Sequence, residues 1–419
     1  MTAYEGRFPS RVAMLAMHTS PLEMPGAGDA GGLNVFVREV SERLGSRGIE
    51  VDIFTRRRDD TTPEIVDMAE GVRVIHVDAG PPESIEKEAM PRLVGRFANA
   101  IAGRMRDYDL IHSHYWLSGA VGLELASTEL PLVHTMHTMA AVKNATRADG
   151  HRPETDERED AEKAIVAAAS VLTANTPEEA RELRRHYHAA PSQIAIVHPG
   201  VDLHVFHPCN RPASRERLEL DPDAQIVLFV GRVQPLKAPD VLIRATAELL
   251  RADPTRPLKV LILGSPSGPQ PQWAATLPEL ARELGLSGVP DRPDVVTFAR
   301  HVPRDELQSW YCASDLVAVP SYNESFGLVA MEAQACGRAV VATDVGGLRH
   351  AVLRERTGVL VDGHAPEDWA AAIGSVLDDQ PRRLQMERAA AGHAAGFSWD
   401  NTASAMIEAY CAAVGLRRL

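Results

Sequence analysis

Short, almost continuously apolar segments alternate with helix-like segments along the whole chain, and this alternation constrains the fold more than any other feature. Such short apolar runs are typical of strands in a parallel sheet that helices cover on both faces. The predicted strands form two series, at residues 11–17, 51–55, 72–77, 110–114, 132–137 and 171–174, and at residues 226–230, 260–263, 295–298, 316–319 and 340–342. The sequence therefore predicts two doubly wound α/β domains.

The boundary between the two series falls in residues 199–222, a segment rich in Pro and His with little periodicity. We expect an N-terminal domain over residues 1–205, a C-terminal domain over residues 206–396, and a final helix over residues 397–419 that crosses back to the N-terminal domain. A second Pro-rich stretch, residues 265–272, predicts a surface loop. Ligands of such sheets bind at the carboxyl ends of the strands, so the functional residues are expected in the loops there.

Charge and cysteine content exclude several classes of protein. The 419 residues include 44 Lys and Arg against 57 Asp and Glu, a net charge of −13, which argues against a general nucleic-acid binder. Cys209, Cys312, Cys336 and Cys411 are scattered without a CxxC or Cys/His cluster, so we expect neither a disulfide framework nor a zinc site. No apolar run is long enough to span a bilayer and no targeting segment is visible, which predicts a cytoplasmic protein without a membrane partner.

A Gly-rich loop, GAGDAGGLN at residues 26–34, follows the first predicted strand. Glycines let the backbone approach a ligand closely, and the start of the next helix presents N–H groups to an anion. The spacing differs from the dinucleotide-binding GxGxxG pattern, and a tight strand-to-helix turn explains the loop equally well.

Two cations, Arg232 and Lys237, follow the first strand of the second series in the string VGRVQPLKAP. Two fixed cations in one loop suit a diphosphate whose negative charge grows as it leaves. A solvated basic turn is the alternative interpretation. The chain contains no GxxxxGK[ST] string, so a P-loop is excluded.

Two carboxylates, Glu324 and Glu332, flank Gly327 in NESFGLVAME. We expect the chain to break at Gly327, which leaves Glu324 on a loop and places Glu332 about one turn into a helix. Carboxylates accept hydrogen bonds from vicinal sugar hydroxyls, and the helix start offers N–H donors to phosphate. The alternative is a helix start that carries Glu because the helix dipole favours it.

Polar residues end two strands of the first series, in HSHYWLSG at residues 112–119 and HTMHT at residues 134–138. A buried sheet would place apolar residues there, so these strings indicate either a site or a satisfied turn. The residues of the first domain that we group as candidates are Lys87, Tyr115, His137, Thr138 and Arg158.

These strings resemble those of the retaining glycosyltransferases of the GT-B type, family 4, and within that family the subgroup of the mycothiol pathway that joins N-acetylglucosamine to inositol phosphate. The resemblance covers nearly the whole chain and is carried by HTSPLEMPGAGDAGGLNVFV, HSHYWLSG, HTMHTMAAVKN, VGRVQPLKAPDVL and NESFGLVAMEAQACG. It implies two Rossmann-like domains facing a cleft. It also implies retaining transfer of an N-acetylglucosamine-like sugar from a UDP- or GDP-linked donor to 1D-myo-inositol 3-phosphate or a similar small anion.

The resemblance further implies roles for individual residues, with no cofactor required for the chemistry. The implied donor-binding residues are Gly32, Arg232, Lys237, Glu324, Phe326, Gly327, Leu328 and Glu332, the last of them at the nucleotide ribose. The implied acceptor-binding residues are His18, Asp29, Asn34, Lys87, Tyr115, Thr138 and Arg158. The implied catalytic residues are Arg232, Lys237, Glu324 and His137, the last close to the donor sugar. The leaving diphosphate helps to deprotonate the acceptor by a front-face route, so no protein nucleophile is expected.

Three departures from the subgroup lie on or near the donor side. Met24 replaces a Gln, Gly264-Ser265 replaces Gly-Gly, and Arg349-His350 stands where a Pro is usual. They leave open a paralogue of antibiotic biosynthesis that uses a GDP-activated sugar and another small acceptor, such as ergothioneine in a lincosamide pathway. A sucrose-phosphate-synthase-like transfer to fructose 6-phosphate is a further alternative. A non-catalytic sugar-phosphate or nucleotide-binding protein is disfavoured because Arg232, Lys237 and Glu324 are all present.

Two further features of the family bear on this chain. A homodimer is compatible with the sequence. The family's structural Mg²⁺ lies near the segment that here holds Tyr311, Cys312, Ser314 and Arg338, and these residue types match it only in part.

Overall fold

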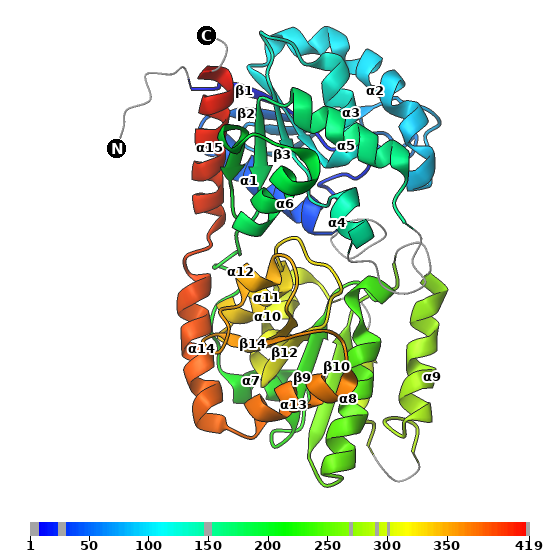
Figure 1. Ribbon diagram of the computed structural model, residues 1–419, viewed down its shortest axis with the longest axis vertical. Helices are drawn as coiled ribbons and strands as arrows, with labels where there is room; N and C mark the ends of the chain where they lie inside the picture. Colours follow the sequence, from blue (N-terminus) through cyan, green and yellow to red (C-terminus); the bar gives the residue numbers. More distant parts are fainter. Residues whose placement is uncertain are drawn as a thin grey trace. The chain divides into compact units, whose positions relative to one another are not determined.

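The computed structural model describes residues 8–23, 31–145, 153–267, 271–289, 293–299 and 302–415. These residues form two compact units, each an α/β layer structure around its own sheet (Figure 1). The first unit comprises the described residues up to residue 200 together with those from residue 399 onward, and the second comprises residues 201–398.

The first unit contains an eight-stranded sheet in the order β3-β4-β2-β1-β5-β6-β7-β8. Its strands are β1 (Arg11–Leu15), β2 (Glu50–Arg56), β3 (Ile65–Ala69), β4 (Val72–Val77), β5 (Leu110–His114), β6 (Leu132–Thr135), β7 (Val171–Ala174) and β8 (Ile194–Ile196). Neighbouring strands are parallel except β3 and β4. The strand order reverses between β1 and β5, so the loops that follow these two strands diverge and leave room for a ligand.

Helices cover this sheet, and one of them comes from the far end of the chain. The helices of the first unit are α1 (Gly32–Gly45), α2 (Val94–Ile101), α3 (Tyr115–Leu125), α4 (Ala140–Ala145), α5 (Asp156–Ala168), α6 (Pro177–Tyr187) and α15 (Trp399–Gly415). Helix α15, red in Figure 1, packs beside α1. The Tyr410 hydroxyl of α15 lies 2.7 Å from His112 Nδ1 on β5, which fixes the last helix to the sheet.

The second unit has a six-stranded, all-parallel sheet in the order β11-β10-β9-β12-β13-β14. Its strands are β9 (Gln225–Val230), β10 (Leu258–Leu263), β11 (Val296–Ala299), β12 (Leu316–Val319), β13 (Ala339–Thr343) and β14 (Gly358–Val361). Its helices are α7 (Arg211–Arg217), α8 (Pro239–Ala252), α9 (Thr276–Glu283), α10 (Arg304–Ala313), α11 (Leu328–Ala335), α12 (Leu348–Ala351), α13 (Pro366–Leu377) and α14 (Gln380–Ala394). The strand order reverses here between β9 and β12.

All predicted strands are present, with small shifts at their ends, whereas β3, β8 and β14 were not predicted from the sequence. Each of these three strands lies at the edge of its sheet. An edge strand is buried by fewer neighbours and needs no continuous apolar run, and β3 and β8 are accordingly half-buried or exposed along their length. The predicted loop at residues 265–272 is wrong at its end, because a 3₁₀ turn begins at Pro271.

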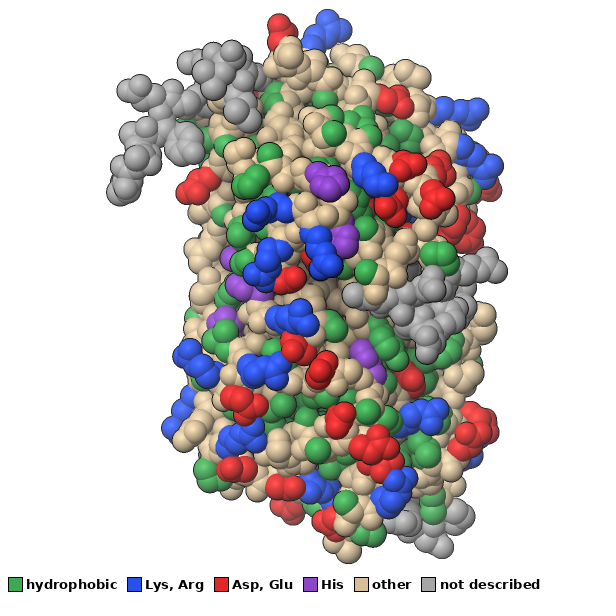
Figure 2. Space-filling view, in the orientation of Figure 1, with side chains coloured by type: hydrophobic (Ala, Val, Ile, Leu, Met, Phe, Trp, Pro, Cys, Tyr) green, Lys and Arg blue, Asp and Glu red, His purple; other side chains and the backbone are tan. Residues whose placement is uncertain are grey.

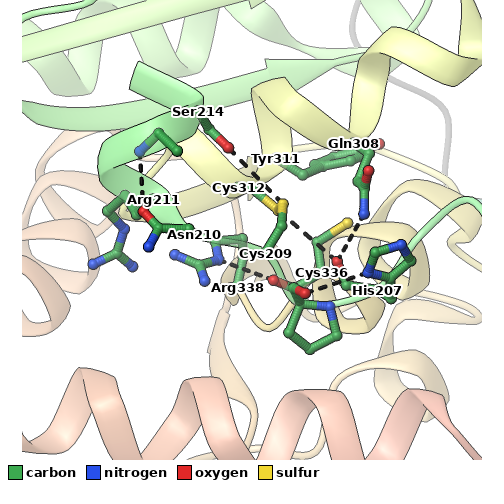
Figure 3. Close-up of a disulfide and its surroundings, with 12 residues drawn as sticks. His207, Cys209, Asn210, Arg211, Ser214, Gln308, Tyr311, Cys312, Cys336 and Arg338 are labelled. Atoms are coloured by element: carbon green, nitrogen blue, oxygen red, sulfur yellow. Dashed lines mark hydrogen bonds between the residues drawn. A yellow bond between two sulfur atoms is a disulfide. The ribbon is translucent and has the colours of Figure 1, made fainter. Parts of the chain in front are cut away.

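A disulfide links Cys209, just before α7, to Cys312 on α10, with the two Cα atoms 5.9 Å apart (Figure 3). The expectation of no disulfide is therefore wrong. The two cysteines are separated by 103 residues, and no local spacing motif predicts such a pair. The segment at residues 199–222 is consequently more than a linker, since it contains α7 and is fastened to the second unit. Cys336 and Cys411 are buried free thiols.

Two surface properties follow from the described residues. None of the described helices is both long enough and apolar enough to cross a membrane. On the face displayed in Figure 2, Lys and Arg side chains are interspersed with Asp and Glu side chains. That mixture accords with the negative net charge of −13.

The disulfide predicts a measurable contribution to stability. Closing a loop of about 100 residues in the unfolded chain contributes up to roughly 5 kcal/mol to the free energy of unfolding. We expect Cys209→Ser to lower that free energy in non-reducing urea titrations, and dithiothreitol to destabilise the wild type but not the variant. Cys411→Ser, a buried free thiol on α15, is the control that should retain the response to dithiothreitol. An unchanged unfolding midpoint in Cys209→Ser would contradict the prediction.

Candidate functional site

The first candidate site lies where β1 and β5 end, at the reversal of strand order in the first unit. His18 follows β1 and is buried, and Tyr115 begins α3 directly after β5. Their ring centroids are 4.6 Å apart, so the two loops meet at these side chains. The backbone of Tyr115 is left-handed, with φ of 69°, which is costly for a bulky residue and is often found at functional sites.

Two cations lie over the ring of Tyr115. Lys87 Nζ is 4.3 Å from the ring centroid, and the guanidinium carbon of Arg158 is 4.9 Å from it. Lys87 begins a 3₁₀ turn that ends at Ala89, and Arg158 belongs to α5. An aromatic face attracts a cation by its quadrupole, so Tyr115 holds two positive groups in one place. Two adjacent cations beside a phenol form a natural site for a small anion.

Arg158 is only 2 % exposed and its guanidinium is extensively bonded. Nη2 donates to the carbonyl and hydroxyl oxygens of Thr138 at 3.1 and 3.0 Å, and Nε donates to Glu162 at 2.8 Å. Nη1 lies 2.9 Å from a carboxylate oxygen of Glu154. Burial lowers the pKa of Arg158, but Tyr115, Glu162 and Glu154 raise it above its ordinary value. The cation is thus held permanently charged and in one orientation.

Arg56, at the end of β2, was not among the candidates from the sequence. Its buried guanidinium donates to the carbonyl oxygens of Pro81 and Glu83, at 2.8 and 2.5 Å, and thereby fixes the loop that leads to Lys87. No carboxylate in the described residues bonds to it. Burial and the neighbouring Arg58 lower the pKa of Arg56. An arginine at the end of a predicted strand is the sequence signal that could have found it.

Asn34, in the first turn of α1, connects that helix to the end of β1. Its side-chain nitrogen donates to the Thr19 hydroxyl and the Ser20 carbonyl, both at 2.7 Å, and its side-chain oxygen accepts from Gly31 N at 3.0 Å. These bonds make Asn34 a brace for the loop after β1. Asp29 and Met24 lie outside the described residues, and Gly32 is the first residue of α1.

Four histidines lie near the candidate anion site: the buried His112 and His114 on β5 and His134 on β6, and the half-buried His137 after β6. His114 Nδ1 lies 2.9 Å from His137 Nε2, and His137 has a left-handed backbone with φ of 59°. Burial lowers the pKa of both His134 and His137 to about 3. Burial also lowers the pKa of His18, His112 and His114 well below its usual range. These imidazoles are therefore neutral near pH 7.

The second candidate site lies where β9 and β12 end, at the reversal of strand order in the second unit. Lys237, in a short turn after β9, donates to the carboxylate of Glu324, which follows β12. The two motifs lie 87 residues apart in the chain and meet in this ion pair. Arg232 is half-buried and makes no side-chain hydrogen bond or ion pair within the part of the chain that the structure describes. Its charge therefore remains available to a ligand.

Glycines bring the surrounding loops of the second site unusually close together. Gly327, with φ of 96°, precedes α11, and a Cβ there would lie 2.8 Å from the Leu348 side chain. A Cβ on Gly347 would lie 2.2 Å from the Ser325 carbonyl oxygen, and one on Gly264 would lie 1.8 Å from the Gly231 carbonyl oxygen. The loops around Glu324 and Arg232 can take these positions only because no side chain intervenes.

Glu332 lies one turn into α11, as expected from the break at Gly327. Its carboxylate accepts a hydrogen bond of 2.8 Å from the buried Tyr311 hydroxyl. Burial and the Glu332 charge raise the pKa of Tyr311 well above its usual range, so this phenol stays a donor. Phe326 is buried beside the start of α11, and Leu328 is the first residue of that helix.

The segment around Tyr311 does not fit a magnesium ion. Cys312 is in the disulfide (Figure 3). The Tyr311 hydroxyl is bonded to Glu332, and the Ser314 carbonyl accepts from Arg211 and Arg338 at 3.2 and 3.3 Å. Two guanidinium groups repel a divalent cation at this position. Among the described residues, no three His, Cys, Asp or Glu side chains are placed to hold a metal.

Comparisons with known proteins relate both units to one enzyme class. Residues 30–205 match the model of Glycosyltransferase Family 4, and residues 210–393 match that of Glycosyl transferases group 1. The chain is 51% identical over 424 residues to the D-inositol 3-phosphate glycosyltransferase of Kineococcus radiotolerans, covering 96% of this chain and 95% of that protein. It is 52% identical over 412 residues to the enzyme of the same name from Nocardia farcinica, covering 97% of this chain and 90% of that protein.

Solved structures show the same architecture. Sucrose-phosphate synthase from Thermosynechococcus elongatus has a TM-score of 0.87 and 32% identity, covering 96% of this chain and 98% of that one. HepE of Anabaena, in complex with UDP and glucose, has a TM-score of 0.74 at 18% identity, covering 95% of this chain and 98% of that one. The expected GT-B fold, built from two Rossmann-like domains, is confirmed.

The neutral histidines predict a loss of stability in acid. A histidine whose folded pKa lies below its unfolded value of about 6.5 stabilises the fold above pH 6.5, and this stability is lost as the pH falls. Each such histidine lowers the free energy of unfolding by up to about 1.4 kcal/mol for every pH unit below 6.5. For His134 and His137 this decline continues down to about pH 3. We expect the free energy of unfolding in urea to be lower at pH 5.5 than at pH 7.5.

His137→Gln tests the origin of this pH dependence, because Gln cannot take up the proton. The variant should show a shallower decline of unfolding free energy with pH than the wild type. His204→Gln, at an exposed position, is the control that should keep the full decline. Equal pH dependence in His137→Gln and the wild type would contradict the assignment.

Proposed function

The chain belongs to the glycosyltransferases that join a family 4 domain to a group 1 domain, and we propose that it transfers an N-acetylglucosamine-like sugar from a nucleoside diphosphate to 1D-myo-inositol 3-phosphate. One observation carries the choice of a phosphorylated acceptor: Lys87 and Arg158 lie over the same ring, that of Tyr115. The name of the relatives that are about half identical along nearly the full chain supports the inositol phosphate.

The acceptor phosphate is assigned to the first unit. Lys87 supplies a compact charge, and Arg158 supplies a guanidinium that Glu154 and Glu162 keep in place. Tyr115, Thr138 and Asn34 complete the acceptor site, and His18 and Asp29 border it. Burial of Arg158 and Tyr115 makes their interactions stronger than they would be in water, since water competes less for the phosphate oxygens.

The donor is assigned to the second unit, with a UDP or GDP leaving group. Arg232 and Lys237 hold the diphosphate, Glu324 and the backbone at Phe326–Leu328 bind the sugar, and Glu332 binds the ribose. In the free protein Glu324 balances the charge of Lys237. Diphosphate binding adds negative charge beside Lys237 and Arg232, and that charge grows in the transition state, where the two cations stabilise it most.

The reaction proceeds on one face of the sugar. The bond from the anomeric carbon to the diphosphate oxygen breaks while a bond forms to the acceptor hydroxyl oxygen, and the hydroxyl proton passes to the departing diphosphate. The configuration of the anomeric carbon is retained because the acceptor oxygen enters on the same face of the sugar from which the diphosphate departs. The protein supplies cations and hydrogen-bond donors rather than a nucleophile, which matches the residues gathered in the two candidate sites.

A second candidate reaction is transfer to fructose 6-phosphate. The sucrose-phosphate synthase structure favours it, because that chain is 32% identical with a TM-score of 0.87. Its acceptor also carries a phosphate and would use the same cations. An uncharged or zwitterionic acceptor such as ergothioneine would leave the Lys87 and Arg158 charges without a phosphate partner, so this alternative has less support from the site.

The deciding experiment measures transfer for every pair of donor and acceptor. UDP- and GDP-linked N-acetylglucosamine and glucose are each combined with inositol 3-phosphate, fructose 6-phosphate and ergothioneine, and products are identified by mass. The largest kcat/KM is expected with inositol 3-phosphate, and the anomeric configuration of the product is read by NMR. A larger value with fructose 6-phosphate or ergothioneine would overturn the proposed acceptor.

Lys237→Met should reduce kcat by about 10²–10³-fold, because a preorganised charge at a developing anion contributes several kcal/mol to catalysis. Steady-state kinetics with saturating donor provide the measurement. Lys259→Met is the matched control, since Lys259 lies on β10 and donates to the Asp294 carbonyl. Wild-type kcat in Lys237→Met would show that the diphosphate binds elsewhere.

Lys87→Met should raise the acceptor KM roughly 10- to 100-fold and change the donor KM little, because a hydrogen bond to a charged group contributes about 1.5–3 kcal/mol. Lys87 is preferable to Arg158 for this test, since removing Arg158 would leave Glu162 buried without its partner. Lys143→Met, whose lysine pairs with Glu154, is the control. An unchanged acceptor KM in Lys87→Met would argue against the phosphate site.

A further inference from the structure

Three consecutive arginines at the end of β2, Arg56, Arg57 and Arg58, bond to different segments of the first unit. Arg56 and Arg58 are two residues apart, the spacing at which side chains of an extended chain lie on the same side. Both bond to segments that carry residues of the first candidate site. Arg57 instead bonds to the Thr62 carbonyl and to the exposed Asp78, which directly follows β4. The end of β2 thus contacts two segments of that site.

Arg56 holds the loop between β4 and Lys87. Residues 78–86 contain no helix or strand, so no regular ladder of hydrogen bonds fixes their path. The Arg56 guanidinium donates to the carbonyl oxygens of Pro81 and Glu83, at 2.8 and 2.5 Å, in the middle of this loop. The Arg56 side chain is itself buried, so packing fixes the anchor. Lys87 follows Glu83 by four residues, and the two bonds therefore limit where its ammonium group can lie.

Arg58 holds the chain that follows β1. Its guanidinium donates to the His18 carbonyl oxygen and lies 2.6 Å from a carboxylate oxygen of Glu23. The other carboxylate oxygen of Glu23 accepts from the Thr19 hydroxyl at 3.4 Å, and this hydroxyl accepts in turn from the side chain of Asn34. Arg58 therefore begins a chain of polar contacts that ends in the first turn of α1.

The two segments meet at Tyr115. The His18 ring centroid lies 4.6 Å from that of Tyr115, and Lys87 Nζ lies 4.3 Å from the same centroid. The attraction of an ammonium group to an aromatic ring is weak, and a lysine side chain has many rotamers. The contacts at Tyr115 alone therefore allow the two segments to shift, and the bonds from Arg56 and Arg58 constrain them further.

We propose that Arg56 and Arg58 are positioning residues that set the affinity of the first site for the phosphorylated acceptor. Arg56 acts through the loop that leads to Lys87, and Arg58 acts through the chain that begins at His18. A phosphate binds most tightly to groups that are already in place, since their ordering then costs nothing on binding. This inference deepens the proposed function, on which its kinetic part rests.

Limited proteolysis of the free, full-length protein tests the positioning of the loop without any substrate. Endoprotease Glu-C cleaves after glutamate, and Glu83 and Glu86 are exposed in the loop that Arg56 holds. Arg56→Lys keeps the charge, but one ammonium group cannot span both carbonyls as the guanidinium fork does. We expect this variant to be cleaved in the loop roughly 3- to 10-fold faster than the wild type, and Arg57→Lys to be cleaved at the wild-type rate. Equal rates in Arg56→Lys and the wild type would overturn the role of Arg56, whatever the enzyme transfers.

A double-mutant cycle tests whether Arg56 acts through Lys87. In the wild-type background, Arg56→Lys should raise the acceptor KM about 5- to 20-fold and change kcat and the donor KM little. In the Lys87→Met background, the same substitution should have little further effect, because the group that it positions is gone. Effects of the two substitutions that multiply in the acceptor KM would show that Arg56 does not act through Lys87.

Arg58→Lys should also raise the acceptor KM about 5- to 20-fold, and this effect should multiply with that of Lys87→Met, because Arg58 holds a different segment. Arg57→Lys, the same substitution at the neighbouring residue, is the matched control and should leave the acceptor KM unchanged. An unchanged acceptor KM in Arg58→Lys would overturn the role of Arg58. Failure of the proposed function is distinguishable, because it appears as absent transfer to inositol 3-phosphate by the wild type while the cleavage rates of the free variants stay as expected.

Discussion

The reversal of strand order in each sheet is the constraint on which both candidate sites depend. Between β1 and β5, and again between β9 and β12, consecutive strands lead their helices to opposite faces of the sheet. The loops after these strands diverge, which leaves room for polar side chains between them. His18 and Tyr115 occupy this place in the first unit, and Arg232 and Glu324 occupy it in the second. The strand order of each sheet therefore determines where its candidate site lies.

Two of the cations at these positions are stable as charged groups because they pair with carboxylates. Arg158 is held by Glu154 and Glu162, and Lys237 by Glu324. Desolvation of an unpaired ion would cost several kcal/mol, so the carboxylates keep the cations charged and oriented in the absence of ligand. Arg56 is stabilised in a different way, because its guanidinium donates to backbone carbonyls rather than to carboxylates.

The sequence predicted the buried strands well, because these depend on local patterns. Continuous apolar runs identified the central strands, and Gly327 correctly located the start of α11. Features that depend on tertiary contact were missed. The edge strand β3 lacks a continuous apolar pattern and β8 is only three residues long, Cys209 and Cys312 meet across 103 residues, and Arg56 acts through a loop that has no motif. The bond between His114 and His137 likewise required the geometry of two neighbouring strands.

The protonation states of the first site explain why the proposed reaction needs no protein base. The depressed pKa values of the buried histidines leave them neutral at pH 7, and burial raises the pKa of Tyr115, which keeps its proton. The acceptor proton then leaves with the group that gains most negative charge during the reaction, the diphosphate oxygen. Cations, fixed N–H donors and a base supplied by the substrate form one consistent design for substitution on a single face of the sugar.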